Sequence, residues 1–244
     1  SLIPIITRKL SVTAALMILG INTVLWTAFF LWKLPTHSLY RPQTVGRGDI
    51  IHVIHRLKRP LWLSALLSPA QYGLLTYTLM DLHTRWHTTD RIAGLLLALG
   101  LSGGLMTRIL FGYLSDRHGH RAHLLSLMAG FGAVFLSLWA VIPLATPVGI
   151  IAVLFFFMGA AIDGWNAVLS AWTMRQASPG EAGLAFAIVG VAGFIGIAVI
   201  LPILGWAIQQ SGSYRAAWII LAILYFIGTF VAHQRPAHLA SSVG

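Results

Sequence analysis

Seven long apolar runs, separated by short polar segments, dominate the pattern of this 244-residue chain. Each run reaches the roughly 20 residues that a helix needs to cross the hydrocarbon core of a bilayer. Long unbroken apolar runs, unlike the alternating pattern of a membrane β-strand, indicate helices. The expected spans are residues 10–32, 61–80, 92–114, 124–142, 148–172, 183–208 and 216–232. The pattern predicts an all-α fold, a polytopic transmembrane helical bundle.

The connections between the runs are short, except for residues 33–60. This stretch combines Pro35, Pro42, Gly46 and Gly48 with several basic residues, which is typical of a mobile linker. We therefore divide the chain into four parts. They are a first transmembrane helix (1–33), a basic linker (34–60), a six-helix transmembrane bundle (61–232) and a tail (233–244).

The composition points to lipid as the solvent. Hydrophobic residues make up 57% of the chain and charged residues only 9%, whereas a globular domain carries roughly 25% charged residues. So few charges cannot cover a water-exposed surface. A bilayer also obliges each span to satisfy its own backbone hydrogen bonds, which leaves helices or closed barrels. We expect an integral membrane protein whose partner is the lipid bilayer.

The formal net charge of +10 reflects the position of basic residues between the apolar runs. Bases that bind nucleic acid gather on a solvated face, so no nucleic-acid partner is expected. One set of alternating connections holds ten Lys and Arg: Lys33, Arg41, Arg47, Arg56, Lys58, Arg59, Arg117, Arg121, Arg175 and Arg235. The other holds five: Arg8, Lys9, Arg85, Arg91 and Arg215. Because cytoplasmic loops carry the excess, we expect the linker and the C-terminus in the cytoplasm.

The sixth run is preceded by a helix-start signal. Ser178 offers a capping hydroxyl, Pro179 suits the first helical position, and Glu181 places a carboxylate three residues after the cap. This pattern predicts a capped helix that begins at the cytoplasmic surface.

Between the third and fourth runs stands GYLSDRHGHR, residues 112–121. A glycine near the helix end is followed four residues later by an Asp-Arg pair, and Gly119 permits a tight turn. This segment resembles the signature loop of the major facilitator superfamily, which reads glycine, three residues, Asp, a base, one residue, Gly and two bases. The matching residues are Gly112, Asp116, Arg117, Gly119 and Arg121. His120 departs from the pattern at a basic position, although histidine can still carry charge.

The resemblance covers nearly the whole chain and implies a transporter built from two six-helix halves. In that family the loop follows the second and the eighth helix. Only two runs precede the motif helix here, and a long basic linker separates them, so the motif helix corresponds to the eighth of twelve. Residues 1–33 then contain the last helix of an N-terminal bundle whose other five helices are missing, and the start at Ser1 hints at a fragment.

The resemblance also implies a conformational role for Asp116. Its carboxylate would latch onto the positive N-terminal end of the helix that starts near Pro179, a contact of about 0.3–2 kcal/mol. Arg117 and Arg121 would be loop charges. The alternative is that Asp116 and Arg117 are solvated turn residues.

Two ionisable residues lie inside apolar runs. Asp163 stands 15 residues into its span, about 22 Å deep at 1.5 Å per residue. Arg108 lies about 9 Å from the cytoplasmic end of its own span. A lone carboxylate near the middle of the membrane is costly unless it is protonated, paired or hydrated. We expect Arg108 and Asp163 to pair, either to bind substrate or exchange a proton, or as a static pair that fixes helix packing.

Other candidates for a central cavity are polar and aromatic residues of the spans: Gln71, Tyr72, Thr76, Tyr77, Thr107, Trp165 and Asn166. Such a set suits a polar organic solute with an apolar part, although each residue is individually compatible with packing or interface anchoring. Gly190, Gly193 and Gly196 stand at three-residue spacing, which predicts close helix approach in lipid, with a hinge as the alternative.

No metal or other cofactor is expected. The chain has no cysteine, and its histidine groups lack a carboxylate or thiol partner at a recognised spacing. These groups are His118, His120 and His123 in one segment and His52 and His55 in another. A GxxxxGK[ST] nucleotide loop is absent, so ATP drive is not built in.

An enzyme is not expected, because Asp163 has no second acid or histidine at similar depth. A retinal-type receptor would need a lysine inside the last helix, which is lacking. We expect a secondary active transporter, an ion- or proton-coupled symporter or antiporter working by alternating access in a bacterial inner or plasma membrane. Its partners would be a small-molecule solute, a proton or other coupling ion, and the missing N-terminal bundle. The alternative is a truncated, non-transporting remnant or a helix-bundle interaction module.

Overall fold

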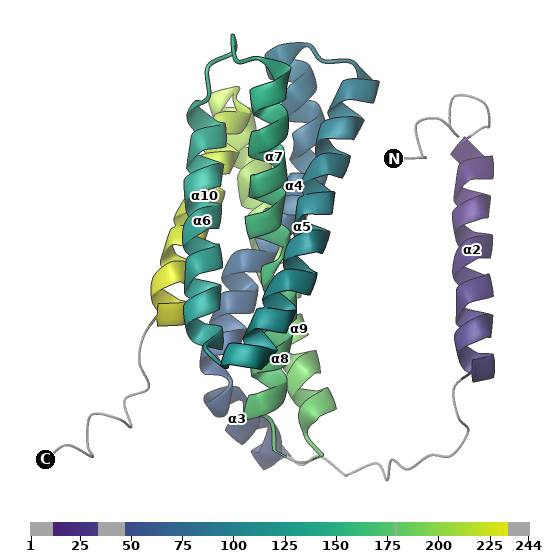
Figure 1. The fold of residues 1–244 in the computed structure, drawn as a ribbon, viewed down its shortest axis with the longest axis vertical. Coiled ribbons are helices and arrows are strands. Elements are labelled where there is room, and N and C mark those ends of the chain that lie inside the picture. The colour runs from purple at the N-terminus through teal and green to yellow at the C-terminus, as the bar shows by residue number, and fades with distance from the viewer. Residues whose placement is uncertain (1–11, 34–46, 179, 234–244) are drawn as a thin grey trace, which may run out of the picture. The chain divides into compact units, whose positions relative to one another are not determined.

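The computed structural model describes residues 12–33, 47–178 and 180–233 (Figure 1). These residues form helices joined by short turns, without a strand, which confirms the all-α prediction. The helices are α2 (Val12–Lys33), α3 (Arg47–Arg56), α4 (Lys58–Trp86), α5 (Asp90–His118), α6 (Arg121–Val141), α7 (Val148–Asp163), α8 (Trp165–Gln176), α9 (Ala182–Ser211) and α10 (Tyr214–His233).

Two compact units make up the chain, residues 1–45 and residues 46–244. The first unit contains α2, a helix of 22 residues that has no acidic residue in its first turn and ends at Lys33. On α2, Trp26, Phe29 and Phe30 pack ring to ring, with centroids 5.8–6.0 Å apart. A helix that is apolar on every face suits a lipid environment.

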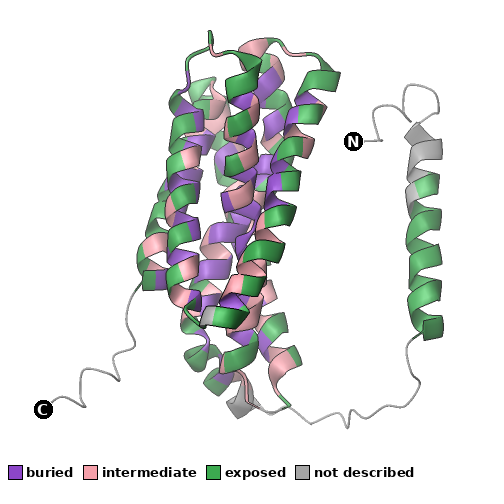
Figure 2. Ribbon diagram, viewed as in Figure 1, coloured by how far each residue is buried: buried purple, intermediate pink, exposed green. Residues whose placement is uncertain are grey.

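The second unit is a helical bundle built from three close pairs: α4 with α9, α5 with α7, and α6 with α10 (Figure 1). Buried residues face the interior, whereas the outer surface is exposed (Figure 2). Large apolar side chains stand on that surface, such as Ile109 at 70% exposure and Phe194 at 63%. An exposed apolar surface of this kind requires a lipid solvent.

Five helical segments are long and apolar enough to cross a membrane: Asp90–Arg117, Arg121–Val141, Val148–Gln176, Ala182–Ser211 and Tyr214–His233. They confirm five of the seven expected spans. Helices α2 and α4 cover the other two expected runs, and their membrane crossing stays a prediction. With 29 residues α4 is long enough, but Ser64, Ser68 and Gln71 make it more polar than its neighbours.

The segment expected to be a mobile linker is partly helical. Helix α3 occupies residues 47–56, and Val53 and Leu57 are fully buried against the bundle. Residues 34–46 lie outside the described residues. The structure therefore differs from the expected linker over residues 47–60, because apolar residues at helical spacing give this stretch a face to bury.

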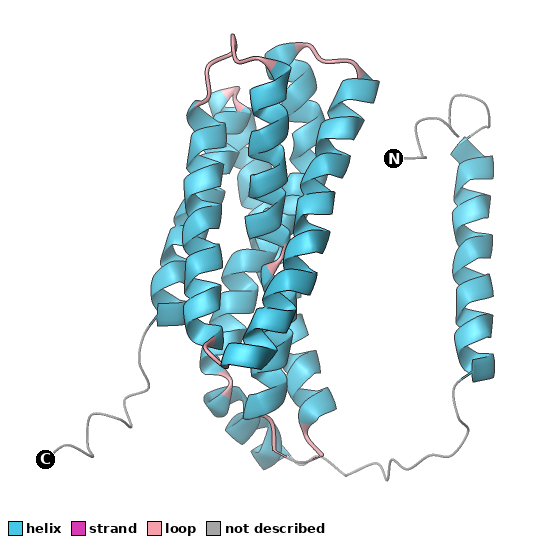
Figure 3. Ribbon diagram, in the orientation of Figure 1, coloured by secondary structure: helices cyan, strands magenta, loops and turns pink. Residues whose placement is uncertain are grey.

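The fifth expected span forms one segment long enough to cross the membrane, Val148–Gln176. Within it, Gly164 separates helices α7 and α8 directly after Asp163 but keeps helical dihedral angles, φ −75° and ψ −24° (Figure 3). A Cβ atom at Gly164 would lie 2.5 Å from the Thr107 methyl carbon and 2.7 Å from the Ala160 carbonyl oxygen. Gly164 thus sits where α5 packs so closely that a larger residue would force its neighbours to shift.

The start of α9 differs from the predicted capping box. Its N-cap is Glu181, which makes no side-chain capping hydrogen bond. The Ser178 Oγ instead accepts a hydrogen bond from Arg56 Nη1 at 2.5 Å, and the Glu181 carboxylate pairs with the same guanidinium. The prediction was wrong on the start of the helix and on the serine cap, because α9 begins at Ala182, four residues after Ser178. The Glu181 carboxylate also interacts with the backbone of Ser178, as the predicted capping box expects. Pro179 lies outside the described residues.

One end of the bundle carries α3, the α5–α6 turn, the α8–α9 loop and the end of α10; we name it the motif end (Figure 1). Gly119 forms the α5–α6 turn with φ 71°, and its N–H donates to the Ser115 carbonyl at 3.1 Å. This left-handed conformation confirms the tight turn expected at Gly119. The α4–α5, α6–α7 and α9–α10 connections form the opposite end.

Candidate functional site

The expected ion pair between α5 and α7 is present. Arg108 Nη2 lies 2.8 Å from Asp163 Oδ1, and Arg108 Nε donates to the Asp163 carbonyl oxygen at 2.9 Å. The Asp163 side chain is 8% exposed and that of Arg108 is 37% exposed. The prediction from depth is therefore confirmed as a contact, whereas the role of the pair in transport stays a prediction.

Side chains contact two backbone carbonyl groups at the end of α7. Besides the Arg108 bond to the Asp163 carbonyl, the Tyr225 hydroxyl lies 3.0 Å from the Ile162 carbonyl oxygen. These contacts link the end of α7 to α5 and α10 beside the charge pair.

A cavity of about 230 Å³ opens beside this point, between α4, α8 and α9. Four expected site residues line it: Gln71, Tyr72, Trp165 and Asn166. Asn166 Nδ2 donates to Gln71 Oε1 at 2.8 Å, and the Gln71 side chain also interacts with the Asp163 carboxylate. A continuous polar chain thus runs from Arg108 through Asp163 and Gln71 into the cavity.

Three other cavity candidates lie elsewhere. The Tyr77 hydroxyl donates to the Leu201 carbonyl at 3.1 Å, which ties α4 to α9. The Thr107 hydroxyl bonds the Gly103 carbonyl of its own helix, and Thr76 is an exposed residue of α4 that does not line the cavity. These residues serve packing or face outward.

In the motif loop, Asp116 accepts a hydrogen bond from Arg121 Nη2 at 3.3 Å. The Arg121 side chain is 6% exposed, whereas that of Asp116 is 72% exposed. Arg117 Nη1 contacts the Tyr113 hydroxyl at 3.2 Å. The structure directs Asp116 to its own loop, while Arg56 of α3 contacts the start of α9. The latch role of this loop stays a prediction.

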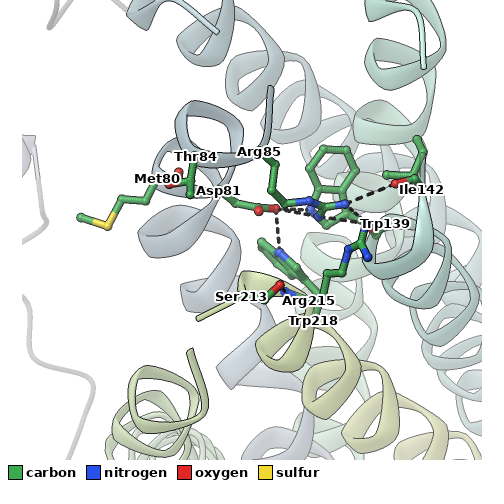
Figure 4. A network of polar contacts seen from close by, with 9 residues as sticks. All are labelled: Met80, Asp81, Thr84, Arg85, Trp139, Ile142, Ser213, Arg215 and Trp218. Atoms are coloured by element: carbon green, nitrogen blue, oxygen red, sulfur yellow. Dashed lines mark hydrogen bonds and ion pairs between the residues drawn. The ribbon is translucent and has the colours of Figure 1, made fainter. Parts of the chain in front are cut away.

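Sequence reasoning missed a buried polar cluster at the opposite end (Figure 4). The Asp81 carboxylate is fully buried, and its Oδ2 accepts hydrogen bonds from the indole N–H groups of Trp139 and Trp218, both at 2.9 Å. Arg85 Nη1 lies 3.3 Å from the same oxygen. One carboxylate therefore joins α4, α6 and α10.

The interpretation of Arg85 as a loop charge needs correction. Its side chain is 8% exposed, and it donates to the Trp139 and Ile142 carbonyls at the end of α6. Its guanidinium also stacks 4.2 Å from the Trp86 ring centroid. The available sequence signal was an Asp and an Arg four residues apart on one helix, a spacing that brings side chains together.

Across the part of the chain that the structure describes, no group of three or more His, Asp and Glu side chains is arranged to hold a metal ion. The polar groups around the cavity are amides and hydroxyls, and the charges beside it are the Arg108–Asp163 pair. This chemistry suits reversible binding of a solute and a change in the charge state of one carboxylate.

Comparison with protein families gives one match. The family model described as Major Facilitator Superfamily matches residues 61–242, which is most of the chain and runs from the first turn of α4 through α10. The chain has no match among curated proteins.

Proposed function

Because the chain belongs to the major facilitator superfamily, we propose that this membrane transporter is a secondary active one that moves a small solute by alternating access. The family match covers the helices that form the cavity and the ion pair. The proposed points beyond family membership are the coupling to a proton or another ion and the nature of the solute.

One observation carries the proposal: a buried Arg–Asp pair lies inside the membrane-spanning helices and connects through an amide to a cavity. Solute and ion sites of secondary transporters lie near the middle of the membrane. Ionisable residues at such depth are expensive and commonly functional. Asp163 is the natural coupling group of this site.

Coupling follows from the charge of Asp163. When the carboxylate is ionised it attracts Arg108 and accepts its hydrogen bonds; when it binds a proton that attraction is lost. Because Gln71 and Asn166 relay the change to the cavity wall, proton binding and solute binding influence each other. A static pair would hold α5 to α7 but would not tie uptake to a proton gradient.

In this proposal the motif end faces the cytoplasm, following the excess of Lys and Arg in its connections. Asp116 then acts as a conformational latch at the cytoplasmic side, in a loop formed by Gly112, Arg117, Gly119 and Arg121. Since Asp116 is mostly exposed here, it is free to exchange its Arg121 contact for another partner during the transport cycle.

The proposal is tested by an uptake assay in which the solute need not be known in advance. Liposomes containing the chain are incubated with a small-molecule cell extract, with and without an acid-outside pH gradient, and the lumen is analysed by mass spectrometry. We expect at least one solute to accumulate under the gradient. Asp163→Asn should lower this accumulation at least about tenfold, because the Asn side-chain amide cannot take up or release a proton in the pH range of the assay.

Asp90→Asn is the matched control, since the Asp90 side chain is 90% exposed and remote from the cavity. It should transport like the unchanged chain. Equal, gradient-dependent accumulation by Asp163→Asn would refute the coupling role. Failure of the folded, unchanged chain to accumulate any solute would favour the non-transporting alternative.

A further inference from the structure

Two serine hydroxyls on α4 line the cavity without a hydrogen-bond partner. Ser64 is 5% exposed and Ser68 is 7% exposed, and both line the cavity between α4, α8 and α9. Within the described part of the chain, neither hydroxyl makes a hydrogen bond. Because both residues line the cavity, a polar group of a solute that enters it can hydrogen-bond to these hydroxyls.

Other hydroxyls in these helices behave differently. Thr84, Ser137 and Thr173 each donate to the carbonyl four residues earlier, at 2.8 Å. This local bond is the ordinary way to satisfy Ser and Thr inside a helix. Ser64 and Ser68 forgo it and keep their hydroxyls available to the cavity.

A glycine on α9 lets both hydroxyls lie close to the α9 backbone. A Cβ atom at Gly193 would lie 2.7 Å from the Oγ atoms of both Ser64 and Ser68. Three residues further, a Cβ at Gly196 would lie 2.1 Å from the Ala65 carbonyl oxygen, whereas Gly190 has nothing within 4 Å. Gly190, Gly193 and Gly196 thus confirm close helix packing at Gly196. The space between α4 and α9 widens toward Gly190, which makes a wedge-shaped recess between the two helices.

The cavity wall carries no formal charge. Its polar members are serines and the Gln71–Asn166 amide pair, and its aromatic members include Tyr72, Trp165 and Phe186. The nearest charges, Arg108 and Asp163, compensate each other at 2.8 Å. A charged solute would therefore lose its water without gaining a counter-charge from this wall.

We infer that the cavity takes an uncharged solute with hydroxyl or amide groups on one side and an apolar or ring face on the other. Ser64 and Ser68 bind the polar side in the recess that widens from Gly193 toward Gly190. This inference rests on the proposed transport function and specifies its substrate class.

Thiol labelling tests the charge selectivity directly, because the chain has no cysteine. Ser170→Cys places a reporter on the α8 wall of the cavity, and Ser211→Cys places a reference thiol at an exposed site of the opposite end. Each purified full chain in detergent is treated with hydroxyethyl, sulfonatoethyl or trimethylammonioethyl methanethiosulfonate. These three reagents share one reactive group and differ in charge.

We expect the ratio of neutral to charged labelling rates to be at least about tenfold higher at Ser170→Cys than at Ser211→Cys, a preference equivalent to 1.4 kcal/mol. Equal ratios at the two sites would overturn the inference. So would the absence of any labelling at Ser170→Cys in folded protein, because the cavity would then be closed to solutes. Labelling needs no transport, so this result is independent of the uptake assay.

The hydroxyl pair is tested in the same reporter. Ser64→Ala with Ser68→Ala should lower the rate of the hydroxyethyl reagent about threefold relative to methyl methanethiosulfonate, because two hydrogen-bonding groups are lost. Gly193→Ala should slow both reagents by filling the recess, whereas Gly183→Ala on the same helix, with nothing within 4 Å of its Cβ, should not. Unchanged rates in the serine double variant would refute the assigned role of Ser64 and Ser68.

Discussion

At the scale of single residues, Asp81 shows how strongly one buried charge holds its surroundings. It has no exposed side-chain surface, and Arg85 beside it is 8% exposed. We expect Asp81→Asn to lower the free energy of unfolding by up to about 3–5 kcal/mol, because it leaves the guanidinium buried without its counter-charge. Thermal or chemical unfolding of the purified chain in detergent measures the change.

Asp90→Asn provides the comparison on a side chain that is 90% exposed. The same substitution there should change the free energy of unfolding by only about 0–1 kcal/mol. If both variants unfold alike, the Asp81 cluster does not stabilise the opposite end.

The two buried acids also differ in how far sequence could predict them. Asp163 lies well inside an apolar run, so depth along the helix predicted both its burial and its pairing with Arg108. Asp81 stands just after the run 61–80, where it resembles a loop charge. Its burial depends on Trp139 and Trp218, 58 and 137 residues further along the chain. Only the packing of α4 against α6 and α10 brings these residues together.

At the scale of elements, the junction of α7 and α8 packs closely against its neighbours at Gly164. Gly164→Ala should destabilise the bundle by about 1–3 kcal/mol, because the added methyl meets Thr107, Ala160 and Met128 within 2.5–2.8 Å. Gly149→Ala on α7 is the control, since nothing lies within 4 Å of its Cβ. It should be neutral or stabilising by up to about 1 kcal/mol from helix propensity. Equal destabilisation of both would contradict the packing argument.

Helix α3 is held to the α8–α9 loop by Arg56. Its hydrogen bond to Glu181 holds the pKa of that carboxyl below the ordinary 4.5. A depressed pKa means that the contact is complete above the ordinary value and is lost as pH falls through the lowered one. The protection factors of the α3 amides, which correct for the pH dependence of intrinsic exchange, should therefore be constant around neutral pH and decrease as pH falls below the ordinary 4.5.

Arg56→Ala should raise the exchange of α3 amides about two- to fivefold at pH 7, the range expected for a surface ion pair. Hydrogen–deuterium exchange with mass spectrometry measures it. Arg175→Ala, which removes an exposed base at the same end, should leave α3 unchanged. Similar acceleration in both variants would mean that net charge, rather than the Arg56 contact, controls α3.

Element boundaries were predictable where lipid sets them and less so elsewhere. The apolar runs matched the helices because a span must be apolar over its whole length. The predicted helix start at Ser178 was wrong because α9 begins at Ala182. The partner of Ser178 and Glu181 is Arg56, which lies 122 and 125 residues away in sequence, and local patterns do not contain such a partner. The same holds for the close contact between Gly164 and Thr107 of α5.

At the scale of the whole molecule, the composition and the motif loop were sufficient to predict a helical membrane protein of this family. The cavity was predictable only as a set of polar residues in α4 and α8. The contribution of α9 could not be predicted, because only the folded structure places Gly193 next to Ser64 and Ser68 of α4. Sequence patterns predict which side chains lie on each face of a helix, whereas packing determines which neighbouring helix that face contacts.

The orientation of the bundle is a prediction at this scale. His120→Cys at the motif end should react with a membrane-impermeant maleimide only after intact cells are permeabilised, because basic connections remain in the cytoplasm. Ser211→Cys at the opposite end should react in intact cells. The reverse pattern would place Asp116 and its loop outside and exclude a cytoplasmic latch.

The stacked indoles of Trp86 and Trp139 give the opposite end an optical signature. Their rings lie 4.8 Å apart at an interplanar angle of 24°, close enough for their excited states to couple. Such a pair adds an exciton-coupled circular dichroism band in the far ultraviolet, which an indole without a stacked indole partner does not give. Any conformational change that slides α4 against α6 would change this band, so circular dichroism of the unlabelled protein would report that movement.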